Sequence, residues 1–157
     1  MTAATVSLDQ LESHLWESAN ILRGPVDAAD FKTYIFPLLF FKRISDVHDE
    51  EYQAALIESA GDEEYALFPQ NYGFQVPEGC HWRDVRAVTT NVGQALQKAM
   101  RGSEKANPET LYGIFGDAQW TNKDRLPDHM LRELLEHFSG TTLSLSNCPE
   151  DELGVGY

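Results

Sequence analysis

The spacing of apolar residues along the chain predicts a series of amphipathic helices. In residues 8–22, leucine and alanine recur three and four positions apart, which is the repeat of a helix with one apolar face. Ser7 and Gln10 before this stretch have the spacing of a capping box. Gly24 and Pro25 after it are typical of a helix end. The pattern therefore predicts a first helix over 8–22.

The most apolar stretch, residues 31–46, has Pro37 in its middle and fits either a buried strand or a helix. In a strand, Pro37 would interrupt the hydrogen-bond ladder at its centre. In a helix it removes one hydrogen bond, at a cost of about 3 kcal/mol unless packing or a kink relieves it. The apolar residues follow helical spacing on two faces, which favours a helix kinked at Pro37. With Asp27 as its cap and Gly61 as its stop, this helix would be about 50 Å long.

Residues 34–41 are apolar on almost every side, so this helix needs neighbours all around it and is predicted to be the central one. The rest of the chain predicts shorter elements. They are an irregular segment at 61–81, a helix over 92–100 capped by Asn91, a helical turn after Pro108, a loop at 113–124 and a helix from Pro127 to Gly140. The predicted fold class is all-α: a small helical bundle domain around a long, Pro-kinked central helix, with irregular loops.

Composition places the chain among soluble globular proteins. Its 157 residues are enough for one domain, and 42% of them are apolar and 24% charged. The first 22 residues do not resemble a signal peptide, and no apolar run approaches the roughly 18 residues of a membrane span. Cys80 and Cys148 are too few for a disulfide framework, which indicates free thiols and a cytoplasmic location.

Charge is abundant and unevenly distributed. The formal net charge is −13, and a chain with this surplus of acid should be repelled by a phosphate backbone. Residues 45–64, however, contain eight carboxylates and no Lys or Arg, whereas residues 83–105 contain five basic and two acidic residues. The domain can therefore present a locally basic face in spite of its net charge.

The sequence shows no catalytic, cofactor-binding or metal-binding pattern. None of the five histidines stands at a metal-ligand spacing, and the glycines are not arranged as in a phosphate loop. The carboxylates Asp46, Asp49 and Glu50 could hold a divalent cation from one helix face, but such a run is more typical of a solvated helix end. The aromatic stripe of residues 31–41 is in turn more typical of a core than of a binding surface.

Lys42 and Arg43, directly after the apolar run, have two interpretations. Their side chains could reach phosphates or the acidic groups of a partner. Alternatively, they end a buried segment, and Lys42 pairs with Asp46 at helical spacing. The second interpretation is favoured by the spacing, and both stay open from the sequence.

Two stretches together are similar to a known family. LESHLWESANILRG (11–24) and FKTYIFPLLFFKRISD (31–46) resemble the start of the modification subunit of type I restriction-modification systems. The agreement rests on Leu11, Leu15, Trp16, Ala19, Leu22, Arg23, Gly24, Phe41, Ile44, Ser45 and Asp46. Later segments resemble the family more loosely, and Pro37 departs from its pattern, which accepts an ordinary apolar residue there.

The resemblance implies a domain of a larger enzyme. The full subunit of that family is an adenine-N6 DNA methyltransferase that uses S-adenosylmethionine, whose motifs belong to a later domain. Residues 1–148 then form the N-terminal helical domain, and residues 149–157 begin the linker to a catalytic domain. No cofactor is expected in this chain itself. The implied partners are a specificity subunit, a second modification subunit, a restriction subunit and double-stranded DNA, and no membrane.

In this family the N-terminal domain serves assembly and closure around DNA, so basic residues are the candidates for facing the duplex. They are Arg23, Lys32, Lys42, Arg43, Arg83, Arg86, Lys98 and Arg101. Two other functions remain open from the sequence. The acidic charge also fits a helical DNA mimic that occupies another protein's DNA site, and the apolar helices fit an interaction module with no DNA role.

Overall fold

The computed structural model describes residues 8–116 and 118–143, and the named elements of this part are all helical, as predicted. In chain order they are α1 (Leu8–Leu22), η1 (Ala28–Asp30), α2 (Phe31–Glu58), α3 (Glu63–Ala66), η2 (Pro69–Asn71), α4 (Trp82–Arg86), α5 (Val92–Ala106), α6 (Pro108–Leu111) and α7 (Asp128–Ser139). None of these helices is both long and apolar enough to cross a membrane. The predicted cap at Ser7, the domain boundary after residue 148 and Cys148 lie outside the described residues.

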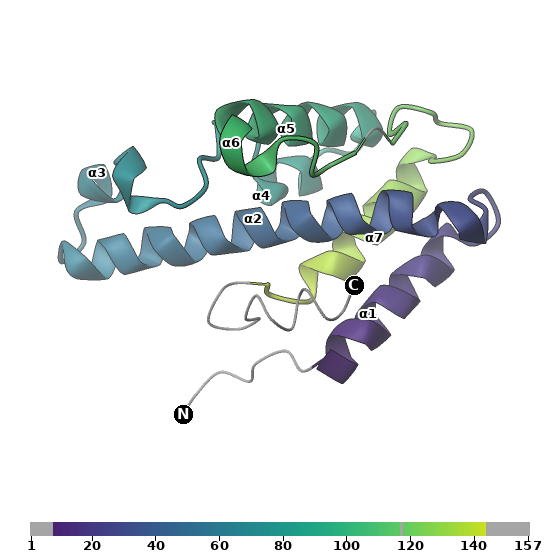
Figure 1. The fold of residues 1–157 in the computed structure, drawn as a ribbon, viewed down its shortest axis with the longest axis horizontal. Coiled ribbons are helices and arrows are strands. Elements are labelled where there is room, and N and C mark those ends of the chain that lie inside the picture. Colours follow the sequence, from purple (N-terminus) through teal and green to yellow (C-terminus); the bar gives the residue numbers. More distant parts are fainter. Residues whose placement is uncertain (1–7, 117, 144–157) are drawn as a thin grey trace.

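Helix α2 runs the length of the molecule and organises the other helices around it (Figure 1). Helices α4, α5 and α6 lie along one side of α2. Helices α1 and α7 pack on each other, and both contact α2. The short helix α3 lies beside the C-terminal end of α2, away from α1. The central position predicted for the long helix is therefore confirmed.

The two halves of α2 have different surroundings. Between residues 34 and 47 it is buried on nearly every side, by Tyr34, Ile35, Pro37, Leu38, Leu39, Phe41, Lys42, Arg43, Ile44, Ser45 and Val47. Beyond residue 47, only Ala55 is buried. The apolar stretch is thus the core of the domain, and the acidic half of α2 extends from it.

Pro37 lies inside α2, and the helix continues through it. The helix interpretation of residues 31–46 is therefore confirmed against the strand. Pro37 cannot donate a hydrogen bond to the carbonyl of Thr33 four residues earlier. Thr33 is exposed, so water can satisfy that carbonyl, while the proline ring itself is buried among apolar neighbours.

Both ends of α2 differ from the prediction. Asp27 precedes the 3₁₀ turn η1 instead, without a side-chain hydrogen bond, and α2 begins only at Phe31. At the other end Ser59 is the cap, and Ala60 adopts a left-handed conformation with φ of 59°. The N–H of Gly61 then donates to the carbonyl of Leu56 at 2.7 Å. The 28 residues of α2 correspond to about 42 Å rather than 50 Å.

The segment predicted to be irregular contains α3 and η2 and is followed directly by α4, and all three are too short to leave a periodic pattern. Helix α5 is longer than predicted and continues to Ala106. Its extension includes Gly102, where a β-carbon would lie 2.5 Å from the sulfur of the buried free thiol Cys80. A close helix-to-side-chain approach explains a glycine there, and sequence periodicity does not reveal it. The predicted turn at 108 and the last helix are confirmed.

Candidate nucleic-acid interface

Lys42 and Arg43, two of the candidate DNA-facing residues, point into the protein. Their exposed fractions are 5% and 6%. The Lys42 ammonium donates to the Asp46 carboxylate and, at 2.9 Å, to the carbonyl of Thr141. The Arg43 guanidinium donates to the carbonyl of Leu143 at 2.7 Å. The pairing of Lys42 with Asp46 is therefore confirmed, and both cations hold the chain after α7.

Asp46 completes this arrangement, which we call the latch and define as Lys42, Arg43 and Asp46 with residues 141–143. The Asp46 carboxylate accepts a hydrogen bond from the N–H of Leu143 at 2.8 Å. Burial raises the pKa of Asp46, and the neighbouring Lys42 ammonium acts in the opposite direction. The latch therefore fixes the segment after α7 to the central helix through two backbone carbonyls, of Thr141 and Leu143, and through the N–H of Leu143.

Ser45, which directly precedes Asp46, has a structural role as well. Its buried hydroxyl accepts a hydrogen bond from the N–H of Trp82 at 2.9 Å, at the start of α4. The Trp82 indole in turn donates to the hydroxyl of Ser139 at 2.9 Å, at the end of α7. The stretch FKRISD thus ties α4 and α7 to α2, instead of presenting a surface.

Arg83 and Arg86, the candidates on α4, lie at the surface. The side chain of Arg83 is 71% exposed, and its guanidinium is 3.9 Å from the Asp49 carboxylate. Arg86 is engaged more closely, since its Nε donates to the Glu136 carboxylate of α7 at 2.5 Å. That hydrogen bond raises the pKa of Arg86. Of the two, Arg83 has the more weakly held charge.

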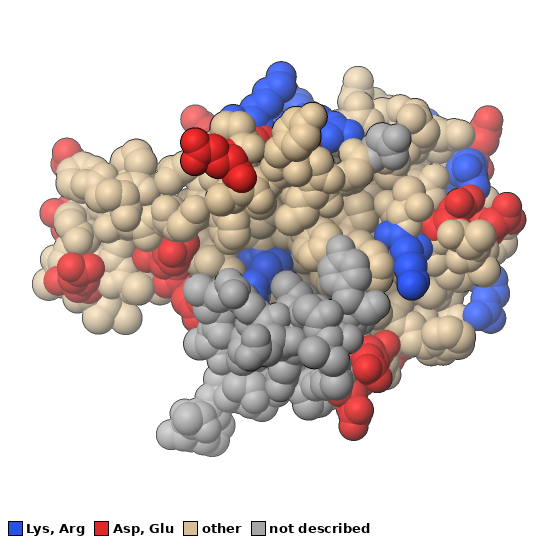
Figure 2. Space-filling model, viewed as in Figure 1, with Lys and Arg blue, Asp and Glu red and all other residues tan. Residues whose placement is uncertain are grey.

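Helix α5 carries the remaining cluster of cations. Lys98, Arg101 and Lys105 share one side of this helix because they are three and four residues apart. Arg101 donates to the Glu104 carboxylate at 2.9 Å and to the carbonyl of Gly116 at 2.8 Å. Lys98 and Lys105 are exposed and have no ion-pair partner among the described residues. Figure 2 shows Lys and Arg side chains along this edge, over α5, and acidic side chains around the end formed by α2 and α3.

Arg23 and Lys32, the last two candidates, are exposed near the turn that joins α1 to α2. The structure therefore does not bring the eight candidates together. They divide into a buried pair at residues 42 and 43 and pairs at the α1–α2 turn, on α4 and, as Lys98 and Arg101, on α5. Lys105, on the same side of α5, was not among the eight candidates. We use the name α5 edge for Lys98, Arg101 and Lys105.

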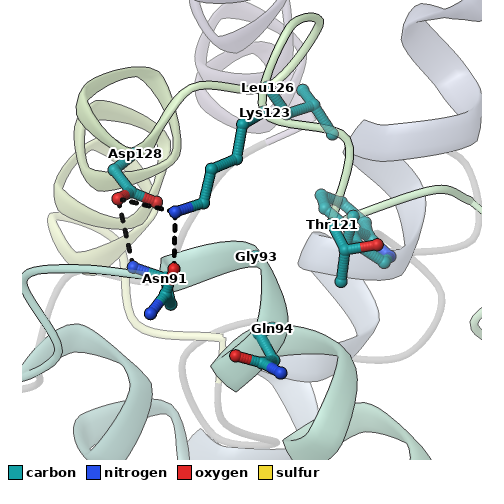
Figure 3. A pocket seen from close by; sticks show the side chains of 8 residues that line it. Asn91, Gly93, Gln94, Thr121, Lys123, Leu126 and Asp128 are labelled. Atoms are coloured by element: carbon teal, nitrogen blue, oxygen red, sulfur yellow. Dashed lines mark hydrogen bonds and ion pairs between the residues drawn. The ribbon is translucent and has the colours of Figure 1, made fainter.

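A hollow of about 210 Å³ lies at the N-terminal end of α5 (Figure 3). The predicted cap Asn91 makes no side-chain cap; its backbone is left-handed, with φ of 54°. Asp128 of α7 caps the helix instead, accepting from the N–H groups of Asn91 and Val92 at 3.1 and 3.0 Å. These hydrogen bonds lower the pKa of Asp128. Lys123 donates to the Asn91 side chain at 2.5 Å. Asn91, Lys123 and Asp128 are thus joined to one another at this hollow by hydrogen bonds and an ion pair.

The sequence did not reveal this cap because Asp128 follows Val92 by 36 residues. Only the packing of α5 on α7 brings them together. The one feature in the sequence that points to Asp128 is its place in the first turn of α7, where an acidic side chain is favourable. That feature predicts the start of α7 and does not predict a cap for α5.

The carboxylates considered for a metal ion are engaged elsewhere. Asp46 belongs to the latch, and Asp49 accepts from the ring of His81 at 2.9 Å. Within residues 8–116 and 118–143 no three metal-ligating side chains come together. His81 also caps α4, where its other ring nitrogen accepts from the N–H of Arg83.

Two more histidines form a partly buried pair between α1 and α7. The rings of His14 and His137 are stacked with centroids 4.0 Å apart, and Phe138 meets His14 edge-on. The His137 ring bonds to the carbonyl of His14 at 2.8 Å. Burial, with the nearby His137 and Lys42, lowers the pKa of His14 to about 4. His14 is therefore neutral at pH 7.

Comparison with models of protein families relates the chain to a known domain. The family model described as the HsdM N-terminal domain matches residues 11–138, which is more than half of the chain. A search of the curated proteins finds no match. The matched range runs from α1 to the end of α7 and so includes all the packed helices.

Proposed function

The chain belongs to the HsdM N-terminal domain family of type I restriction-modification modification subunits, and on this premise we propose that it closes the assembled methyltransferase around DNA. In this proposal the domain has no catalytic residue of its own. It contributes contacts to the specificity subunit and to a second modification subunit, and the complete complex also contains the restriction subunit. The α5 edge faces the duplex.

The observation that carries the proposal is the exposure of Lys98 and Lys105 on one side of α5, without ion-pair partners in the described part of the chain. An uncompensated lysine can replace condensed counterions on a phosphate backbone, which is the main source of non-specific affinity for DNA. Lys42 and Arg43 are not part of the proposed surface because the latch uses their charges internally.

The acidic charge of the domain supports a role in closure rather than in independent binding. With a net charge of −13, the isolated domain should be repelled by DNA at long range. Residues 45–64, which include the second half of α2 and the start of α3, contain eight carboxylates and no Lys or Arg, so this end of the molecule is acidic. A duplex already held by other subunits can meet the α5 edge while the acidic end points away from it.

Chemistry belongs, in this proposal, to the rest of the subunit. S-adenosylmethionine would supply the methyl group for the N6 atom of adenine in a later catalytic domain. The helical elements described here contain no glycine-rich turn between a strand and a helix to hold such a nucleoside. We therefore assign no residue of this chain to the methyl donor.

The test uses the full-length subunit assembled with its specificity subunit. Lys98→Ala combined with Lys105→Ala should weaken duplex binding and lower the slope of log affinity against log salt by about 2, one unit for each phosphate contact. Arg132→Ala on α7 is the matched control, because Arg132 is also exposed and lies on another helix. An unchanged slope for the lysine pair would contradict the proposed role of the α5 edge.

The DNA-mimic alternative predicts a different result. An isolated acidic domain of that kind should inhibit an unrelated DNA-binding protein when added in trans. The inhibition should weaken when Glu58, Glu63 and Glu64 are replaced by Gln. Inhibition of this kind, with no effect of the α5 substitutions, would favour the mimic over closure around DNA.

A further inference from the structure

Tyr112 is the most exposed of the large apolar and aromatic side chains in the described part of the chain. Its exposed fraction is 85%. It directly follows α6, where the backbone leaves the helix with φ of −57° and ψ of 122°. A tyrosine so far from the core does not stabilise the fold through burial, and its ring is accessible to a partner.

The loop that carries Tyr112 is anchored on both sides by apolar side chains. Leu111 before it and Phe115 after it are almost fully buried. The Phe115 ring meets Phe41 of the central helix with centroids 6.5 Å apart. Gly113 and Gly116 have φ of 74° and 63°, a conformation that favours glycine. The chain thus turns sharply twice and presents the tyrosine from a fixed base.

The same loop is bonded to the α5 edge. The N–H of Gly113 donates to the Glu104 carboxylate at 3.1 Å, and Arg101 donates to the carbonyl of Gly116. Arg101 and Glu104 are themselves paired. Tyr112 is therefore adjacent in sequence to Gly113, which is held by Glu104 of α5, and Lys105 of the α5 edge directly follows Glu104 on the helix.

We propose that Tyr112 is a contact residue for the sugar–phosphate backbone of double-stranded DNA. Its ring would pack on a deoxyribose, and its hydroxyl would donate a hydrogen bond to a phosphate oxygen. Lys98 and Lys105 supply charge but are long and flexible, whereas Tyr112 has only two side-chain torsions. Tyr112 therefore fixes the position at which the α5 edge meets the duplex.

General properties of protein–DNA interfaces support this assignment. Half or more of their hydrogen bonds go to phosphate and sugar, and tyrosine is among the side chains that make them. An exposed tyrosine also suits a protein interface, where aromatic residues are enriched. Here Lys105, which follows Glu104 on α5 and has no ion-pair partner among the described residues, favours a polyanion over a protein surface. The inference rests on the proposed function, since it names a further contact of the same edge.

The experiment measures duplex affinity by fluorescence anisotropy, using the full-length subunit assembled with its specificity subunit. Tyr112→Ala removes both the ring contact and the hydrogen bond and should weaken binding roughly tenfold. Tyr112→Phe removes only the hydrogen bond and should weaken binding about threefold. Neither should change the salt slope, because tyrosine carries no charge. Leu67→Ala is the matched control, since Leu67 is another exposed apolar side chain, at the acidic end.

Two results would overturn the inference. If Tyr112→Ala leaves affinity unchanged while the Lys98 and Lys105 substitutions lower the salt slope, the tyrosine is not a DNA contact and the proposed function stands. If Tyr112→Ala prevents assembly, measured by size-exclusion chromatography, and binding of the assembled fraction is normal, Tyr112 contacts a protein subunit. Unchanged binding in both sets of variants would contradict the proposed function as well.

Discussion

Replacing Lys42 separates a structural role from a DNA-binding role for the FKRISD stretch. Lys42→Met keeps most of the volume of the side chain but removes its bonds to Asp46 and Thr141. The Asp46 carboxylate, whose side chain is only 12% exposed, then keeps the N–H of Leu143 but loses its ion-pair partner. Breaking a buried ion pair in this way typically costs about 3–5 kcal/mol. Because a carboxylate with a raised pKa can take up a proton instead, we expect a loss at the lower end of this range, about 3 kcal/mol.

A double variant tests the origin of that loss. Lys42→Met combined with Asp46→Asn removes both charges of this ion pair, and the amide oxygen can still accept from Leu143. The double variant should therefore be destabilised by only about 1 kcal/mol, which is about 2 kcal/mol less than the loss expected for Lys42→Met alone. Urea denaturation at pH 7 measures these values as shifts of the midpoint at constant m-value.

The duplex-binding assay distinguishes a structural Lys42 from a Lys42 that contacts DNA. If Lys42 is structural, Lys42→Met leaves the salt slope of DNA binding unchanged in the assembled enzyme. A stability loss below about 0.5 kcal/mol together with a slope lowered by about 1 would refute the reasoning, because it would place Lys42 on a phosphate.

Two further predictions concern stability. Because burial lowers the pKa of His14 to about 4, folding excludes a proton that the unfolded chain binds below the ordinary histidine pKa of 6.5. The contribution of His14 to stability is therefore fully present above pH 6.5 and is lost toward pH 4. After allowance for solvent screening, the loss between pH 7 and 5 is roughly 1–2 kcal/mol, and urea midpoints should show it. His14→Gln should reduce this loss, whereas His129→Gln, at an exposed position, should not. Gly93→Ala places a β-carbon 1.8 Å from the carbonyl oxygen of Trp120. Overpacking against backbone should outweigh the roughly 1 kcal/mol gain in helix propensity and lower the free energy of unfolding by about 2 kcal/mol, whereas Gly140→Ala, whose β-carbon meets nothing closer than 3.4 Å, should change it little.

The fold was predictable from the sequence to the extent that it depends on local periodicity. Helices α1, α2 and α7 bury continuous apolar faces, and those faces recur at helical spacing in the sequence. The elements that were missed depend on distant partners. Helix α4 has five residues and is held by His81 and by Ser45 of α2. The extension of α5 depends on Gly102 fitting against Cys80. Periodicity carries no information on contacts of this kind.

The candidate interface was predictable only as a set of charges. Sequence gives the type and position of each cation, but whether a cation faces water depends on what covers it. Lys42 and Lys98 are equivalent in charge, yet one is bonded to residues about a hundred positions away and the other is exposed. Conversely, Tyr112 carries no charge signal and lies between the turn predicted after Pro108 and the loop predicted at 113–124.

The inward direction of FKRISD changes what the similarity to the family means. Phe41 contacts Trp82, Ser45 bonds to the start of α4, and Asp46 with its two basic neighbours holds residues 141–143. Each of these contacts joins a residue of the central helix to one at least 37 positions later in the chain. A motif that makes such contacts specifies how the domain closes on itself, and it can recur in proteins whose DNA contacts differ. The residues that decide where DNA lies must then be sought outside the motif, on the α5 edge and the loop that carries Tyr112.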